Sequence, residues 1–383
     1  MTGSAALPIR LMAVAGFLSA MGIRAMDALL PVVASDFAVS VSTAGITVAA
    51  FTLPYGLLQV AFGPLGDRFG KLRVVGLALT AYALATFACA AAGSLPQLVV
   101  LRAIAGGTAG GVIPLCLAHI GDVVPYHARQ ATLGRFLTGA VMAQILSGPL
   151  GGIFGDTLGW RGMFVVLGAA AAGAAFVLLR RADPRPNAPG SGFGLIRFLE
   201  LFRRPEGRRV TLAAFVDGFL LFGSFAYIGA YLREAFALPY TQVGLIVGVF
   251  GLGSLVYTRI AGILVRRLGE VRMLLAGGLL LTAGLAVATL VPSWPVFVPV
   301  QFCLGLGFFT LHGVLQARAT EAIPEARATA VAGFAMMLFF GQSMGALAMG
   351  VAVAHLGWTP AYLLWAALVF AMALALARAF RRP

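Results

Sequence analysis

Long apolar runs separated by short charged loops are the feature that most limits what this chain can fold into. A membrane-spanning helix needs about 20 consecutive apolar residues, and the sequence contains twelve runs of this kind. They cover residues 9–34, 43–64, 74–94, 96–118, 131–154, 161–181, 210–232, 240–263, 271–291, 295–317, 327–352 and 359–379. Only 10% of the residues are charged, whereas soluble domains have about 25%. The chain therefore lacks the polar surface of a soluble globule, and we expect lipid to be its solvent.

Helices are the structure that these runs support. In the hydrocarbon core of a bilayer every backbone polar group needs a partner within the protein, so only helices and closed barrels span it. Barrel strands alternate apolar and polar residues with a period of two, whereas the runs of this chain are apolar at successive positions. The sequence therefore predicts an all-α integral membrane protein with twelve transmembrane helices.

The net charge is +14, and the basic residues that produce it are unevenly distributed along the chain. Most of the 27 Lys and Arg residues fall in segments that alternating spans place on one side of the membrane. Basic loops stay in the cytoplasm, so we expect both termini there, in a bacterial inner (plasma) membrane. Membrane lipid is then the expected partner of this charge, and nucleic acid is not.

A change in composition divides the chain in two. Prolines, glycines and basic residues gather in the segment 183–209, between the sixth and seventh apolar runs. Such clusters mark loops and linkers. We therefore predict an N-terminal six-helix bundle over residues 1–182, a cytoplasmic linker over 183–209 and a C-terminal six-helix bundle over 210–383.

The two halves repeat each other. The spacing Gly-x-Leu-x-x-Arg-x-Gly-x-x-Arg occurs at residues 63–73 and again at 262–272. The pair Gly-Trp at 159–160 returns at 357–358, after nearly the same displacement along the chain. Transporters built from parallel repeats bind their substrate near the midplane, where the repeats meet. The sequence thus predicts two pseudo-symmetric halves with the substrate path between them.

The segment 63–73, Gly-Pro-Leu-Gly-Asp-Arg-Phe-Gly-Lys-Leu-Arg, is a short charged turn between the second and third apolar runs. It resembles the loop signature of the major facilitator superfamily, Gly-x-Leu-(Ala/Gly)-Asp-Arg-x-Gly-(Arg/Lys). The resemblance implies the major facilitator fold, with an Asp67 carboxylate that contacts the positive N-terminus of the eleventh helix near Arg327 and stabilises the outward-facing state. The conformational switch implied by the resemblance consists of Gly63, Asp67, Arg68, Gly70 and Arg73.

Asp27 and Arg102 are ionisable residues of the first half that lie inside predicted spans. A charge in the hydrocarbon core is costly, so it needs a partner or a wet cavity and is functional by default. Helical rise places Asp27, in the first span, and Arg102, in the fourth, about 9 Å below the same membrane face. We expect the two to meet, with Asp27 as proton carrier and Arg102 as its counter-ion. A static ion pair is the alternative, and Arg24, one turn before Asp27, competes as its partner.

The surroundings of both residues extend the resemblance. Residues 26–31, Met-Asp-Ala-Leu-Leu-Pro, resemble the first-helix Asp-x-x-x-Pro of twelve-span drug:proton antiporters. Residues 101–110, Leu-Arg-Ala-Ile-Ala-Gly-Gly-Thr-Ala-Gly, resemble their fourth-helix motif, whose arginine is implicated in proton transfer. The resemblance therefore implies that Asp27 and Arg102 couple transport to protons.

The fifth predicted span carries several small residues and a proline. They are Gly139, Gly148, Pro149, Gly151 and Gly152. Small residues let helices approach closely, and proline bends a helix. The run resembles the Gly-Pro-x-Gly-Gly motif of antiporters, which in the superfamily marks efflux more than uptake.

Other polar residues of the spans are candidates for a second site and for a substrate cavity. Asp217, in the seventh span, lies at a depth similar to that of Arg259 and His312. It is expected to pair with one of them, either as a structural pair or as a second titrating site. The candidates for a cavity that is otherwise lined by Phe and Met are Tyr55, Gln59, Gln144, Tyr227, Tyr231, Gln316 and Gln342.

The resemblance favours a monomeric secondary active transporter that exports a small organic or drug-like molecule in exchange for protons, by alternating access. An importer or uniporter of a metabolite or sugar on the same fold is the alternative, and a transport-inactive membrane receptor is a third. The sequence has no Gly-x-x-x-x-Gly-Lys-Ser/Thr loop, so ATP is not the expected energy source. We expect no cofactor, no metal site and no enzymatic activity.

Cysteine labelling in cells tests the predicted topology. In a background without the three native cysteines, a cysteine in the linker 183–209 should resist membrane-impermeant reagents added from outside. Cysteines at Arg233 and His355 should react with them, because both positions lie in or next to predicted outer loops. External labelling of the linker would contradict the orientation.

Overall fold

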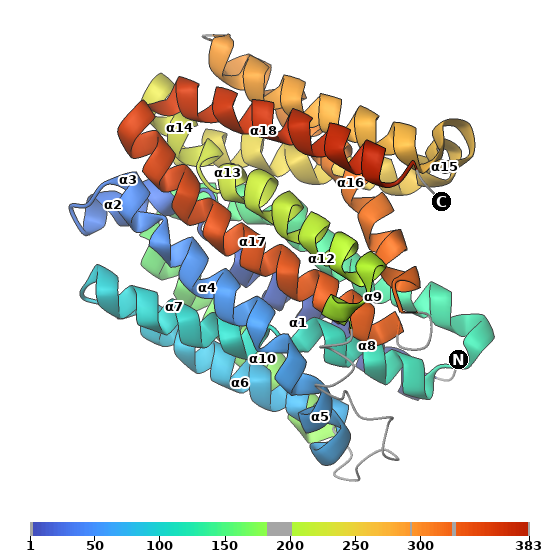
Figure 1. Cartoon of the computed structure of the whole chain (residues 1–383). Helices are drawn as coiled ribbons and strands as arrows, with labels where there is room; N and C mark the ends of the chain where they lie inside the picture. Colours follow the sequence, from blue (N-terminus) through green and yellow to red (C-terminus); the bar gives the residue numbers. More distant parts are fainter. Residues whose placement is uncertain (1–2, 182–200, 292, 324–326, 382–383) are drawn as a thin grey trace.

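The computed structural model describes residues 3–181, 201–291, 293–323 and 327–381, which form helices and turns without any strand (Figure 1). The first half contains α1 (Gly3–Arg24), α2 (Leu30–Asp36), α3 (Val41–Ala44), α4 (Ile46–Leu57), α5 (Gln59–Phe69), α6 (Lys71–Ala90), α7 (Leu95–Ala109), α8 (Val112–Val123), α9 (Tyr126–Asp156) and α10 (Gly159–Arg181). The second half contains α12 (Pro205–Asp217), the π-helix η1 (Gly218–Phe222), α13 (Gly223–Phe225), α14 (Ile228–Phe236), α15 (Tyr240–Leu290), the 3₁₀ turn η2 (Trp294–Val296), α16 (Phe297–Glu321), α17 (Arg327–Leu356) and α18 (Trp358–Ala379).

Helices of membrane-spanning length make up most of the described chain. Nine of them are long and apolar enough to cross a membrane, or ten if the bent pair Leu30–Asp36 and Val41–Leu57 forms one span. α15 holds two of the predicted spans, because non-helical backbone at Gly269 breaks its 51 residues. The predicted all-α membrane fold is confirmed, and the full number of twelve spans stays a prediction.

The start of the second half differs slightly from the predicted boundary. The predicted linker ends at residue 209, whereas α12 already begins at Pro205. Proline is favourable in the first turn of a helix, and the Glu206 carboxylate beside it suits the positive end of the helix dipole. Residues 182–200, which make up most of the predicted linker, lie outside the described residues.

Matched backbone turns reveal the internal repeat. Gly70, between α5 and α6, has a φ angle of 88°, and Gly269, inside α15, has a φ angle of 69°. Residues with a Cβ atom rarely adopt such angles, so glycine lets the chain reverse direction tightly at both places. Ala38 and Ala237 also share a positive φ angle, of 51° and 53°, at corresponding positions of the two halves.

Matched side-chain contacts accompany these turns. Trp160 donates its indole N–H to the Asp36 carboxylate at 3.1 Å, and Trp358 donates to the Glu234 carboxylate at 2.6 Å. The first bond joins the start of α10 to the end of α2, and the second joins the start of α18 to the last turns of α14. The repeat inferred from sequence patterns therefore extends to backbone conformation and hydrogen bonding.

The two halves meet most closely away from the chain ends. Both termini lie at one end of the bundle, which we call the terminal face, and α2, α3 and α14 lie at the other, the opposite face (Figure 1). Near the opposite face α9 packs on α15 at backbone distance. A Cβ atom on Gly148 would collide with the Gly244 carbonyl, and one on Gly152 would collide with the Tyr240 carbonyl. Nearer the middle, a Cβ atom on Gly56 would lie 2.7 Å from Phe339 of α17.

Asp156 completes this closure. It is the last residue of α9, and its carboxylate accepts backbone N–H bonds from Tyr240 at 3.0 Å and from Thr241 at 2.7 Å. These N–H groups belong to the first turn of α15 and have no partner within that helix. The positive end of the helix dipole adds to the attraction. An acid of the first half thus caps a helix of the second half.

Removing this cap should open the opposite face. Loss of an N-cap side chain costs about 1 kcal/mol, so Asp156→Ala should shift the equilibrium toward separated halves roughly fivefold. Spin-label distances measured across the opposite face by pulsed electron paramagnetic resonance report the two populations. Asp36→Ala is the control, because within the described residues the Asp36 carboxylate at the same face bonds to Trp160 and Arg161 of its own half. Equal distance distributions in wild type and Asp156→Ala would contradict the role of the cap.

Candidate functional site

The first predicted span is interrupted at its acidic residue. α1 ends at Arg24, residues 25–29 form turns, and α2 begins at Leu30 with Pro31 in its first turn. Asp27 therefore lies in a non-helical break, and the prediction that it lies inside a continuous helix is wrong. Pro31 explains part of the break, because proline cannot donate a helical hydrogen bond and suits a helix start. Interrupted helices near the midplane are where transporters place their ion and substrate sites.

Within this break Asp27 pairs with Arg24. Its Oδ2 atom lies 3.3 Å from Nη1 of Arg24, and only 3% of the arginine side chain and 4% of the aspartate side chain are exposed. The Asp27 N–H bonds to the Arg24 carbonyl at 3.1 Å, so the turn folds the two residues onto each other. The predicted Asp27–Arg102 ion pair is not found among the described residues. The expected depth of Asp27 holds only for a continuous helix, and the turn brings the competing partner Arg24 closer.

Arg102 instead fastens the broken helix to its neighbours. Its Nη1 atom donates to the Gly22 carbonyl at 3.1 Å, and its Nε atom donates to the Thr47 carbonyl at 3.3 Å. Gly22 lies in the last turn of α1, where carbonyls lack partners within the helix and a cation is favourable. The guanidinium carbon also lies 4.2 Å from the centre of the Phe51 ring. Arg102 thus links α7 to α1 and α4 at the break.

The Arg24 side chain joins the two halves. On the side of the first half, its Nε atom donates to Oε1 of Gln144 at 2.9 Å. On the side of the second half, its guanidinium carbon lies 4.2 Å from the ring centre of Phe222, 4.7 Å from Phe225 and 5.8 Å from Phe250. Aromatic faces attract cations, and more so away from water. The Nη2 atom of Arg24 is buried and has no hydrogen-bond partner in the described part of the chain.

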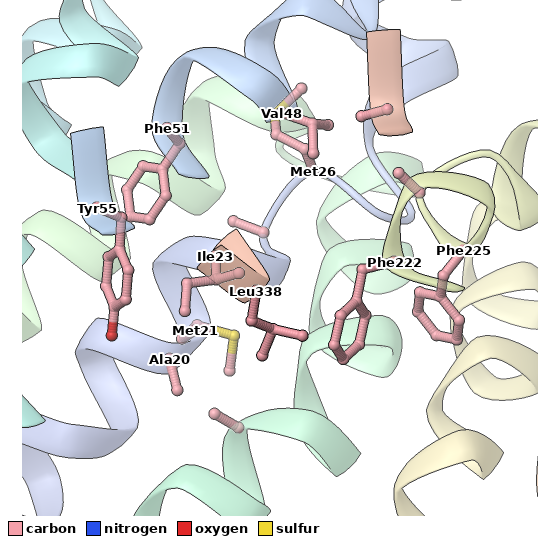
Figure 2. Close-up of a cluster of buried hydrophobic side chains, with 14 of the residues drawn as sticks. Ala20, Met21, Ile23, Met26, Val48, Phe51, Tyr55, Phe222, Phe225 and Leu338 are labelled. Atoms are coloured by element: carbon pink, nitrogen blue, oxygen red, sulfur yellow. The ribbon is translucent and has the colours of Figure 1, made fainter. Parts of the chain in front are cut away.

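Figure 2 shows the apolar side chains around this point. Residues of α1 and α4 face Phe222 and Phe225 of the second half, and Leu338 of α17 lies between them. All of these side chains belong to the buried core. The Arg24–Asp27 pair therefore lies in a dry environment where the halves meet.

A second buried pair lies within the second half. Nδ1 of His312 lies 2.8 Å from Oδ2 of Asp217, and the Asp217 side chain is fully buried. Of the two partners considered for Asp217, the structure places His312 beside it, whereas Arg259 is exposed on α15. Asp217 also ends α12 where the π-helix η1 begins, and π-helical turns are frequent at functional sites.

Two phenylalanines connect the buried pairs. The Phe222 ring, which faces Arg24, lies 4.7 Å from the Phe308 ring. Phe308 in turn stacks on the His312 imidazole at 4.7 Å. A continuous row of side chains therefore runs from the charged group of the first half to that of the second.

The profile of the Major Facilitator Superfamily matches residues 12–233 and 210–383. The chain belongs to the Major Facilitator Superfamily. An uncharacterized transporter of this superfamily, YceJ of Bacillus subtilis, is 28% identical over 330 residues, which is 84% of this chain and 82% of that protein. A chloramphenicol resistance protein of Streptomyces lividans is 29% identical over 386 residues, which is 98% of this chain and 96% of that protein.

Solved structures support the same fold. The crystal structure of the nucleoside transporter NupG superposes with a TM-score of 0.77 at 14% identity, and the match covers 97% of this chain and 99% of that one. The family and these relatives are membrane transporters, so this protein is an integral membrane transporter and not an enzyme.

The superfamily loop signature lies at the terminal face, between α5 and α6. Lys71 lies 3.6 Å from the Asp67 carboxylate and also pairs with Asp122 of α8. The Asp67 carboxylate makes no hydrogen bond to the described residues of α17, and residues 324–326, just before that helix, lie outside the described residues. The expected contact with the eleventh span therefore stays a prediction. The other members of the signature are the half-buried Gly63, the turn residue Gly70 and the exposed Arg68 and Arg73.

The small residues of the fifth span pack α9 against both halves of the transporter. Gly148 and Gly152 face α15, as described above, and Pro149 contacts Gly248 of that helix. On the other side, Gly139 lies against the Ala13 carbonyl of α1. A Cβ atom on Gly151 would lie 3.2 Å from that of Ala28, inside the α1–α2 break. The motif thus positions α9 between the charged break and the second half.

The polar residues predicted to line one cavity are dispersed in the structure. Tyr55 lies 3.1 Å from the Ser19 hydroxyl and Gln144 bonds to Arg24, so both lie near the interface. Tyr227 donates to the Ala346 carbonyl at 3.0 Å. The remaining four are Tyr231, packed among the rings of Phe297, Trp358 and Tyr362 in the second half, the buried Gln342, the half-buried Gln59 and the exposed Gln316.

Sequence reasoning did not anticipate two features of this site. It considered Arg24 only as a competitor for Asp27, although a cation inside an apolar run is itself a signal. It gave no reason to single out Phe222, Phe225 and Phe250 among 28 phenylalanines. These rings become significant only because folding brings them over a guanidinium from the other half of the chain.

Substitution of Arg102 should destabilise the break. In Arg102→Ala the carbonyls of Gly22 and Thr47 lose their donor, and an unsatisfied buried acceptor costs about 1–3 kcal/mol. We expect the melting temperature of the purified protein in detergent to fall by roughly 5 °C. Arg102→Lys keeps the charge and one donor, so its loss should be smaller. Unchanged melting of the alanine variant would show that Arg102 does not hold the break.

Proposed function

We propose that this protein is a secondary active transporter that exports a small organic molecule in exchange for protons. In this proposal it works as a monomer in a bacterial inner membrane, with both termini and the linker 183–209 in the cytoplasm. The six-helix halves over 1–182 and 210–383 rock about the interface described above. The terminal face is then the cytoplasmic face, and the opposite face is the outer one.

The observation that carries the proposal is the Asp27 carboxylate in the α1–α2 break. It is a titratable group, it is buried where the halves meet, and its partner Arg24 also touches three rings of the second half. A carboxylate can take up and release a proton, whereas an arginine stays charged. Protonation of Asp27 therefore leaves Arg24 with an uncompensated charge, which is costly in a dry interface. That cost is a physical route from proton binding to separation of the halves.

Two further observations favour export. The fifth-span motif, which marks efflux in the superfamily, lies in backbone contact with α15 and against the Ala28 side chain of the α1–α2 break. One relative that matches nearly the whole chain is a chloramphenicol resistance protein. We therefore take chloramphenicol as the first molecule to test. The closed opposite face, with its Asp156 cap, suits the stage of such a cycle in which substrate is taken from the cytoplasm.

The loop signature at the terminal face would act as the switch between states. In the present arrangement Asp67 pairs with Lys71. In the proposed outward-facing state the terminal face closes, and Asp67 turns to the N-terminus of α17, where a carboxylate is stabilised by the helix dipole. The Asp156 cap at the outer face and the Asp67 contact at the inner face would then form in alternation.

Replacement of Asp27 by asparagine separates coupling from binding. Asp27→Asn resembles the protonated form permanently, so the variant should still exchange labelled for unlabelled chloramphenicol across proteoliposome membranes. It should lose the transport that an imposed pH gradient drives in wild type, together with the proton movement that a pH-sensitive dye reports. Asp36→Asn makes the same chemical change at an exposed acid and should transport normally. Gradient-driven transport by Asp27→Asn at the wild-type rate would refute the assignment and direct attention to Asp217.

A further inference from the structure

The substrate class can be inferred from the chemistry that surrounds Arg24. Three of its nitrogen atoms have separate environments. Nε donates to Gln144, Nη1 donates to Asp27, and Nη2 is buried without a partner among the described residues. The guanidinium belongs to α1 of the first half, and the rings that cover it belong to the second half. A molecule that binds between the halves would therefore meet both the unused donor and the rings.

The unpartnered Nη2 donor of Arg24 indicates that a ligand at this place should carry a hydrogen-bond acceptor. A hydrogen bond to a charged donor contributes about 1.5–3 kcal/mol, and an unpaired buried donor costs free energy. An oxygen acceptor, such as a carbonyl or nitro group, would satisfy Nη2 of Arg24. The rings of Phe222, Phe225 and Phe250 offer aromatic faces and edges at the same place, and such faces pack well on a flat ring.

The charges around the site argue against a cationic substrate. Arg24 and Arg102 are both buried, and among the described residues Asp27 is the acid that pairs with Arg24. The group carries a net charge of +1 when Asp27 is ionised and +2 when it is protonated, so a cation is repelled in both states. The other buried acid, Asp217, is hydrogen-bonded to His312 in the second half and is separated from Arg24 by the rings of Phe222 and Phe308.

The same charges separate anionic from neutral substrates. An anion is attracted most when Asp27 is protonated, because the site then carries its highest positive charge. It would bind together with the proton and move in the same direction, which is cotransport. If the site exchanges its substrate for protons, anions are therefore excluded as well as cations. Neutral molecules remain, because protonation of Asp27 does not increase their electrostatic attraction to the site.

We propose that Arg24 is the substrate-recognition residue, and that it selects neutral aromatic molecules that carry an oxygen acceptor. The choice of neutral over anionic substrates rests on the proposed proton exchange. The exclusion of cations and the role of Nη2 rest on the geometry and charge of the site alone.

Three matched probes test this inference on the purified full-length protein. They are para-nitrobenzyl alcohol, para-nitrobenzoate and para-nitrobenzylammonium, which share a ring and a nitro acceptor and differ in charge. Isothermal titration calorimetry at neutral pH, repeated in buffers of different ionisation enthalpy, gives both affinity and proton uptake. We expect the neutral probe to bind without proton uptake and the cation to bind at least about tenfold more weakly.

Substitutions of Arg24 give a result that a merely structural role would not produce. Arg24→Gln replaces the charged guanidinium with a shorter, neutral amide, so the neutral probe should bind about 10- to 100-fold more weakly, while the cation should bind more tightly than to wild type. Arg24→Lys removes the guanidinium but keeps the positive charge. Its affinity for the neutral probe should fall, and the cation should still be excluded. Arg180→Gln is the control, because Arg180 also stacks on a ring, Phe176 at 4.0 Å, but is exposed. Loss of folding cannot improve the binding of one probe.

The possible outcomes separate this inference from the proposed function. Failure of the neutral probe to bind, equal binding of the cation, or an unchanged affinity in Arg24→Gln would overturn the recognition role. If para-nitrobenzoate binds more tightly than para-nitrobenzyl alcohol and takes up a proton as it binds, both the choice of neutral substrates and the proton exchange are overturned. If the probes bind as expected but an imposed pH gradient drives no transport, the proposed function fails and the recognition role of Arg24 stands.

Discussion

Burial of charge at the break between α1 and α2 is the constraint on which the centre of this transporter depends. Two arginines and one aspartate are each at most 3% exposed to water, so each charge requires a partner. The break supplies part of what they need. It frees carbonyls at the end of α1 for Arg102, and it turns Asp27 back toward Arg24. A continuous helix would satisfy its own carbonyls and offer neither contact. The interruption of the helix therefore provides the contacts that allow the buried charges to be retained.

Close backbone contact between the halves is the second element of the design. Gly148 and Gly152 let α9 touch α15 without intervening side chains, and Asp156 adds two hydrogen bonds to the end of that contact. A larger side chain at either glycine would hold the helices apart and move the Phe250 ring of α15 away from Arg24. Lipid is as apolar as the side chains, so the hydrophobic effect does not drive helices together within a membrane. Close packing and hydrogen bonds drive their association instead. The packing of α9 thus sets the distance across which the charged group meets its rings.

The sequence predicts the architecture better than it predicts the site. Apolar runs and the repeated Gly-x-Leu-x-x-Arg-x-Gly-x-x-Arg spacing are local properties, and the helices with their matched turns at Gly70 and Gly269 agree with them. The presence of Asp27 and Arg102 inside spans was also evident. Their partners were not, because the depth argument required helix geometry to continue through residues 25–29. Contacts across the halves, such as Arg24 over Phe222, depend on how two bundles dock, and no local pattern encodes that.

The repeat itself explains why the two halves contribute different chemistry. Corresponding positions keep what the scaffold needs, namely left-handed turns and the tryptophan–carboxylate bonds at the opposite face. They differ at the buried charges of the first half. Ala226 stands at the position of Asp27 and Gln301 at that of Arg102, and the second half presents rings instead of charges. A symmetric pair of charged breaks would set like charges against each other in a dry interface. Confining the arginines to one half and the aromatic rings to the other avoids that repulsion and replaces it with cation–π attraction.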